Sequence, residues 1–247
     1  MPTQKPYTAR WLGLELPAGT AKPAPLAVNP QDREIVVVQG LKQDLRVKLQ
    51  RNVPINAPIR IEGQQPGGVD TSIKGETVDA KSDSLAVQLS TGYNTKIGRF
   101  DMVLVAHTEV SGREVTVTSP CITVNLVRAF ALVIPSETIQ IQSGSTFVLE
   151  GKVHRQYPFQ DAVHIQLVDL PLHVTSAPID VPAADSAFRM ELKADPSAET
   201  GEHEIRLVAT ARMEGRKDDK DYSIPDAKLR LKIGRTSSTA SQPQVKD

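Results

Sequence analysis

Five histidines are the residues of this chain best suited to binding a metal or moving protons near neutral pH. They are scattered and follow no metal-binding motif: His107, His154, His164, His173 and His203. His154 and His164 are expected on adjacent strands, where the two rings would approach each other. No cysteine and no third ligand accompanies them, so we predict no metal site and interpret the five as isolated surface or rim histidines.

Cys121 is the only cysteine, which excludes a disulfide within the chain and leaves the redox compartment open. It follows Pro120 at the start of an expected strand, and we interpret it as a packed or half-exposed thiol and not as a nucleophile. The sequence also lacks the Gly-x-Ser-x-Gly motif of serine hydrolases.

Acidic side chains occur in two close pairs, Asp79 with Asp83 and Glu202 with Glu204. We expect these pairs in turns or on solvent-facing strand positions, where carboxyl groups make poor acid–base catalysts. The acidic run at 216–221 offers oxygen ligands for calcium, but its interleaved cations oppose that charge and the EF-hand spacing is missing. We therefore predict no catalytic residue, no cofactor and no metal, and a protein that is not an enzyme.

Trp11, the only tryptophan, lies in a proline-rich N-terminal segment. Aromatic side chains anchor ligands and protein partners, so Trp11 is the one candidate contact for a ligand or partner. The structural alternative is that Trp11 caps one end of the first domain.

The composition nominates no charged partner. The 247 residues carry 29 Lys+Arg and 29 Asp+Glu, so no long-range field steers nucleic acid or an anionic membrane. No apolar run is long enough to span a membrane or to form a signal peptide, which predicts a cytosolic chain or a fragment. No N-glycosylation site is present, which favours a bacterial origin.

A repeated strand organises the chain. Residues 98–106 and 201–209 lie 103 positions apart, share Gly, Leu, Val and Ala, and alternate apolar with polar positions. Such alternation is typical of a strand with one face in a core. Apolar positions on two earlier strands match at 104 residues, together with Arg51 and Arg155. Because a slip of one residue would turn the apolar face outward, the shared register indicates two copies of one fold.

The pattern predicts an all-β protein of two tandem immunoglobulin-like β-sandwich domains, with about seven strands each. We expect a Pro-rich N-terminal segment at 1–25, domain 1 at 26–128, domain 2 at 129–234 and a disordered tail at 235–247. The connection at 126–135 contains no Gly or Ser, so one domain should run almost directly into the next through a stiff joint.

The two copies resemble the tandem Ig-like modules of large bacterial secreted and cell-envelope proteins. The resemblance rests on a Gly turn, a strand ending in Arg, a Gly-led Leu-Val-Ala strand and a closing strand that continues through Val127 and Arg128. It implies spacers and contact surfaces, outside the cell or in the periplasm, with a protein partner or flanking domains and no catalytic residue. Antibody-type domains differ, since Phe100 and Met102 replace their Tyr-x-Cys.

The function predicted from sequence is thus a non-catalytic structural or interaction module. Two alternatives stay open: an accessory carbohydrate-binding module, motivated by Trp11, and a two-domain periplasmic chaperone that acts by strand donation. An enzyme would need an unrecognised site between the domains.

Overall fold

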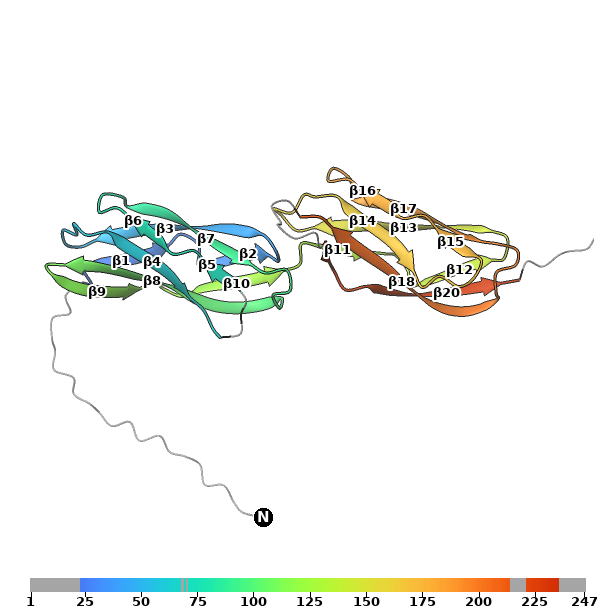
Figure 1. The fold of residues 1–247 in the computed structure, drawn as a ribbon, viewed down its shortest axis with the longest axis horizontal. Coiled ribbons are helices and arrows are strands. Elements are labelled where there is room, and N and C mark those ends of the chain that lie inside the picture. Colours follow the sequence, from blue (N-terminus) through green and yellow to red (C-terminus); the bar gives the residue numbers. More distant parts are fainter. Residues whose placement is uncertain (1–22, 68, 70, 214–220, 236–247) are drawn as a thin grey trace, which may run out of the picture.

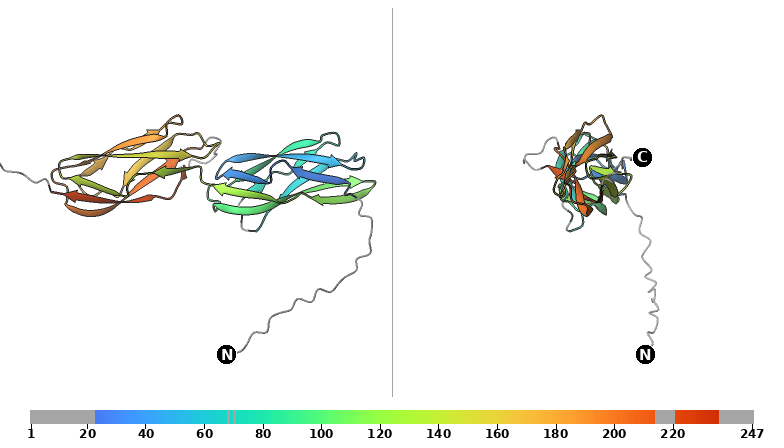
Figure 2. Two further views of the ribbon diagram at one scale, coloured as in Figure 1. Left: turned by 180° about the vertical axis from the view of Figure 1, so that it is seen from behind. Right: turned by 90° about the vertical axis from the view of Figure 1, so that its right-hand side faces the viewer.

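The computed structural model describes residues 23–67, 69, 71–213 and 221–235, and these residues contain no helix. Their strands form two β-sandwiches that lie end to end along the long axis of the molecule (Figure 1). The view from behind shows the same arrangement (Figure 2). The expected all-β class, with two tandem immunoglobulin-like sandwiches, is confirmed.

The first sandwich has ten strand segments: β1 (Leu26–Pro30), β2 (Glu34–Val38), β3 (Lys42–Arg51), β4 (Ile59–Gln64), β5 (Thr71–Ile73), β6 (Glu76–Val78), β7 (Ser84–Thr91), β8 (Gly98–Val110), β9 (Arg113–Thr118) and β10 (Ile122–Val127). One sheet has the order β1-β3-β7-β5. The other has the order β2-β10-β8-β4-β6, and β9 also pairs with β8.

The second sandwich repeats this plan with another ten segments: β11 (Phe130–Val133), β12 (Thr138–Gln142), β13 (Thr146–Arg155), β14 (Val163–Val168), β15 (Val174–Ser176), β16 (Ile179–Val181), β17 (Ala187–Ala194), β18 (Gly201–Ala211), β19 (Tyr222–Ser223) and β20 (Ala227–Gly234). Its sheets have the orders β11-β13-β17-β15 and β12-β20-β18-β14-β16, with β19 on β18. The strand order is therefore identical in the two copies.

Ten segments replace the expected seven strands because three strands of each sandwich are split. The first strand begins as β1, antiparallel to β3, and then crosses to the other sheet as β2, parallel to β10. The segments β5 and β6 likewise pair with different sheets, and β9 and β10 both pair with β8. Rejoining the three pairs gives the seven strands of an immunoglobulin-like sandwich.

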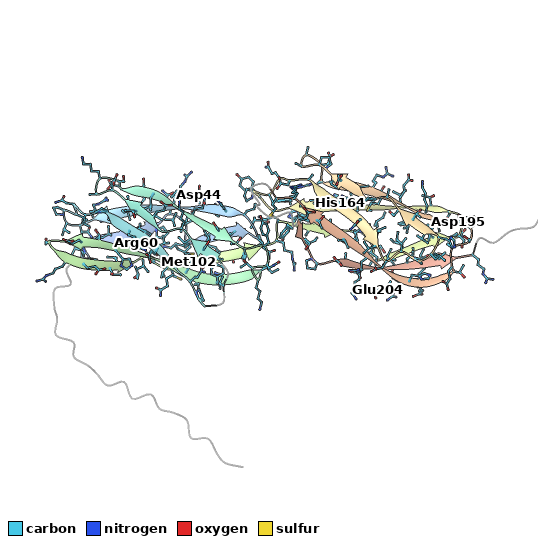
Figure 3. All side chains as sticks on the ribbon, viewed as in Figure 1. Asp44, Arg60, Met102, His164, Asp195 and Glu204 are labelled. Atoms are coloured by element: carbon cyan, nitrogen blue, oxygen red, sulfur yellow. The ribbon has the colours of Figure 1, made fainter. Side chains whose placement is uncertain are left out.

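The repeated strand is central, as predicted. β8 lies between β10 and β4 in its sheet. Its inward side chains Met102, Leu104 and Ala106 are buried. In β18 the inward positions Ile205 and Leu207 are buried in the same way. Both strands begin at a glycine with φ near +147°, a conformation that disfavours side chains. In Figure 3, Met102 lies between the sheets, whereas Glu204 projects from the outer face.

A bulge interrupts the last strand of each copy. Val105 pairs with Thr118 but Met102 pairs with Ile122, so the strand carries one extra residue between them. The Ser119 hydroxyl lies at this break and accepts a hydrogen bond from the Leu104 N–H at 2.9 Å. Cys121 lies beside it and is exposed, so the prediction of a packed or half-exposed thiol was wrong.

Several sequence predictions concern residues outside the described part of the chain. Trp11, most of the Pro-rich segment 1–25, most of the acidic run 216–221 and all but one residue of the predicted tail 235–247 belong there. The boundaries proposed for the two domains stay predictions. The first described strand begins at Leu26 and the last ends at Gly234.

Candidate interaction site at the joint between the sandwiches

The histidines do not come together. His154 is on β13 and His164 is on β14, which belong to different sheets, so the expectation of adjacent strands was wrong. The two residues are ten positions apart on consecutive strands, but the chain crosses between the sheets there. The His164 Nδ1 instead lies 2.8 Å from a carboxylate oxygen of Asp180 on the neighbouring β16. Figure 3 places His164, Asp195 and Glu204 at separate points of the second sandwich.

Of the paired carboxylates, Asp83, Glu202 and Glu204 form ion pairs at exposed positions. Glu202 meets Lys232 at 2.7 Å, and this contact lowers the pKa of the Glu202 carboxyl. Glu204 meets Lys228 at 2.9 Å. Exposed pairs of this kind contribute little to stability because water and salt screen them. Within the described residues, no three His, Cys, Asp or Glu side chains are grouped so that they could hold a metal ion.

The described residues also contain no helix of the length and apolar character needed to cross a membrane. The remaining concentration of specific contacts lies where the two sandwiches meet.

The connection between the sandwiches is two residues long. β10 ends at Val127 and β11 begins at Phe130, so only Arg128 and Ala129 lie between them. Ala129 is fully buried. Val38, the last residue of β2, packs into the hydrophobic core of the second sandwich although it belongs to the first. The near-direct connection expected from the sequence is therefore present, with Ala129 buried and Arg128 exposed.

A chain of hydrogen bonds crosses the joint. The Gln39 side chain donates to the Thr95 carbonyl at 2.6 Å and accepts from the Tyr222 hydroxyl at 2.7 Å. The same hydroxyl accepts from the Ala129 N–H at 3.3 Å, and the Gln39 N–H donates to the Val127 carbonyl at 2.9 Å. Burial raises the pKa of Tyr222, so the hydroxyl keeps its proton for this bond. The Tyr222–Gln39 hydrogen bond thus joins the two sandwiches, and the Tyr222 hydroxyl also binds the linker.

A row of aromatic rings runs from the joint into the second sandwich. Tyr93 of the first sandwich lies 6.4 Å from Tyr222, ring centre to ring centre. Tyr222 meets Phe130 edge-on at 5.8 Å, and Phe130 stacks on Phe159 at 5.5 Å. Four of the ten aromatic residues of the chain are in this row. Aromatic pairs at these distances add stabilisation beyond the area they bury.

Gly40 allows the close approach of the two sandwiches. Its φ is +80°, and a Cβ at this position would lie 2.6 Å from the Tyr93 ring and 3.0 Å from the Met213 sulfur. The matching Gly144 of the second sandwich has φ +75° but faces only Pro196, at 3.4 Å. The turn is therefore shared by both copies, while the tight contact occurs only at the joint.

Sequence reasoning identified the short connection but missed the residues that surround it. The signal was present in the differences between the copies. Phe130 and Phe159 stand where the first copy has Leu26 and Ile55, and Tyr93 stands where the second has Pro196. These three residues, each aromatic in one copy only, belong to the aromatic row at the joint.

Arg51 and Arg155, which match in the sequence, have one structural role. Arg51 ends β3 and Arg155 ends β13. Each donates hydrogen bonds to backbone carbonyls in the loop before β7 or β17. For Arg51 these are the carbonyls of Asp79 and Ser82. Arg155 donates to four carbonyls: Asp161, Val181, Pro182 and Asp185. These residues hold loops together, although the Nε of Arg51 is buried without a hydrogen-bond partner among the described residues.

Comparison with known proteins gives structural neighbours only, since no family model and no curated protein matches the sequence. Fibronectin(III)-like modules of Clostridium thermocellum CbhA cover 85% of this chain and 94% of their own, at 12% identity and a TM-score of 0.28. The D00-D0 domain of intimin covers 83% and 98%, at 10% and 0.32. The titin domains z1z2 in complex with telethonin cover 85% and 98%, at 12% and 0.29.

Identities and TM-scores this low identify neither a family nor a function. The resemblance to tandem immunoglobulin-like modules holds at the level of the fold, and the strand order of the two sandwiches is what establishes it.

Proposed function

We propose that this chain is a non-catalytic structural and interaction module, in which two immunoglobulin-like sandwiches are held in one orientation to space or present neighbouring domains. The observation that carries the proposal is the hydrogen bond between Tyr222 and Gln39 inside a joint where Val38 packs into the core of the second sandwich. Domains joined by a short linker move relative to each other unless their interface is large and apolar. Here the linker residue Ala129 and the aromatic row are buried at the interface.

A fixed joint is useful to a module whose distance and direction matter. Ordering the side chains of Gln39 and Tyr222 costs conformational entropy that a flexible pair of domains would not lose. That cost is offset by burial of the rings and by the hydrogen-bond chain. By its resemblance to envelope modules, we place the protein outside the cytosol of a bacterium, in the periplasm or at the cell surface, with a protein partner or flanking domains.

Small-angle X-ray scattering of the full chain tests the proposal. The wild type should fit one rigid arrangement of the two sandwiches. Gln39→Ala combined with Tyr222→Phe removes the polar link and keeps the aromatic ring, so the scattering should then require a range of orientations. A wild type that already needs such a range overturns the proposal.

Trp11 remains our candidate contact for a glycan, the second function that the sequence motivates. A glycan array probed with the wild type and with Trp11→Ala tests this directly. Binding that disappears in the variant supports an accessory carbohydrate-binding role, and a blank array for the wild type removes it.

A further inference from the structure

The hydrophobic core of the second sandwich is completed by residues of the first. Val38 ends β2 in the first sandwich, is 2% exposed and belongs to the buried core of the second. Leu41, Tyr93 and Val127, also from the first sandwich, are partly buried and pack against that core. Among the described residues, the core of the first sandwich includes none from the second. The joint therefore completes one core from outside and leaves the other self-contained.

The end of the second core that meets the joint is rich in aromatic rings. Phe130, Phe159 and Tyr222 are 1%, 2% and 2% exposed. The Tyr222 ring lies 6.4 Å from that of Tyr93, and its hydroxyl donates to Gln39, so two residues of the first sandwich lie against it. Separation of the sandwiches would bring water to this end. Exposing aromatic surface costs free energy in proportion to its area.

Val38 and Tyr93 are not required by the sandwich fold itself. At the matching positions the second sandwich has Gln142 and Pro196, both exposed, and its strand order is the same. Gln142 shows that a polar residue is compatible with the end of this strand. The apolar and aromatic residues of the first copy therefore serve the contact with the second sandwich.

We propose that the first sandwich is a folding partner of the second, which reaches its full stability only while the first is folded. In arrays of modules, stability is approximately the intrinsic stability of each module plus an interface term for each pair of neighbours. That interface term is lost whichever sandwich unfolds, so the coupling acts in both directions with the same free energy. The order of folding is directional, because the N-terminal domain folds first during synthesis and its core here is self-contained. The second sandwich then folds onto a formed surface.

This coupling goes beyond the proposed function, although both use the joint. A linker of two residues can restrict the orientation of two domains by steric exclusion alone, without adding stability to either. Coupling instead reduces the fraction of chains in which only one sandwich is unfolded. Chains with only the first sandwich unfolded would expose the aromatic end of the second core, so the coupling protects a spacer against partial unfolding.

Native-state hydrogen exchange of the full chain, followed at the slowest amides of β13 and β17, tests the proposal. Val38→Gln places at the joint the residue that the second copy carries. The amides of the second sandwich should then exchange about fivefold faster or more, because its core loses a buried side chain. Val36→Gln is the matched control, since it is the same substitution on the same strand at a residue that is 47% exposed; exchange should stay within about twofold of the wild type.

Leu104→Asp tests the coupling from within the first sandwich. Leu104 is fully buried in the first core, far from any residue that packs against the second, so the charge should unfold the first sandwich. The amides of β13 and β17 should then exchange about tenfold faster or more, because the whole interface is lost. If the first sandwich stays folded in this variant, Val38→Gln decides the question.

Three results overturn the proposal: wild-type exchange in the second sandwich of Val38→Gln, an equal acceleration by Val36→Gln, or wild-type exchange beside an unfolded first sandwich in Leu104→Asp. Scattering of the wild type judges the proposed function separately. One rigid arrangement together with any of these three results removes the coupling and leaves the spacer role standing.

Discussion

The Tyr222 hydroxyl donates a 2.7 Å hydrogen bond to the side chain of Gln39, a residue 183 positions earlier in the other sandwich. Tyr222 is 98% shielded from solvent, and its hydroxyl also accepts from the buried Ala129 N–H. Both partner groups lose their hydrogen bond if this one oxygen is removed. The joint is therefore a place where a single atom connects the first sandwich, the linker and the second sandwich.

Tyr222→Phe should lower the free energy of unfolding by about 1–3 kcal/mol, because a buried amide and a side-chain carbonyl are left unsatisfied. Chemical denaturation of the full chain measures this loss. Tyr157→Phe is the matched control, since Tyr157 is 79% exposed, and it should change stability by less than about 0.5 kcal/mol. Equal stability of Tyr222→Phe and the wild type would show that the hydrogen-bond chain contributes nothing to the joint.

Gly40→Ala should disturb the joint beyond its effect on the backbone. At φ +80° any side chain costs about 1–2 kcal/mol, and here the new methyl group would also collide with Tyr93. Gly112→Ala separates the two effects, because Gly112 has φ +78° but nothing within 4 Å of the added Cβ. We expect the strained backbone to lower the free energy of unfolding of both variants. Only Gly40→Ala should also change the scattering profile. A profile unchanged by Gly40→Ala would mean that the contact with Tyr93 does not set the orientation.

The fold was predictable from sequence because many matching core positions are apolar in both copies. Leu45 and Leu149 match, as do Ile61 and Ile165, and all four are buried. The joint was not predictable in this way. Val38 packs into the core of the other sandwich, while its counterpart Gln142 is polar and exposed. When the two copies are compared, such a pair does not match and is passed over. The mismatch nevertheless marks a contact that only one copy makes.

Leu207→Asp tests the inward face of the repeated strand. Leu207 is 1% exposed between the sheets, so an aspartate there would be a buried charge without a partner and should cost several kcal/mol. Val208→Asp, at the next position and on the outward face, is the control and should cost much less. Thermal unfolding of the two variants measures the difference. A stable Leu207→Asp variant would mean that the inward face has been assigned wrongly.

Arg155→Lys should destabilise the second sandwich by about 1.5–3 kcal/mol, although it keeps the charge. The guanidinium donates to four carbonyls in two loops, and an ammonium group cannot reproduce that planar fork. Burial lowers the pKa of Arg155, because moving the guanidinium out of water disfavours its charged form. Arg189→Lys, at a 73% exposed side chain, should be nearly neutral in the same denaturation experiment. Similar losses in the two variants would contradict a specific role for Arg155.

Gly151 and Phe188 form a cross-strand pair whose counterpart in the first sandwich is Val47 and Leu85. A Cβ at Gly151 would lie 2.4 Å from the Phe188 ring, so Gly151→Val should cost about 1–3 kcal/mol through overpacking. Adding Phe188→Leu recreates the pair of the first copy and opens space for the valine. We expect the double variant to recover most of the loss, with a coupling energy above about 1 kcal/mol in a double-mutant cycle. Additive losses would show that the two side chains do not compensate for each other in volume.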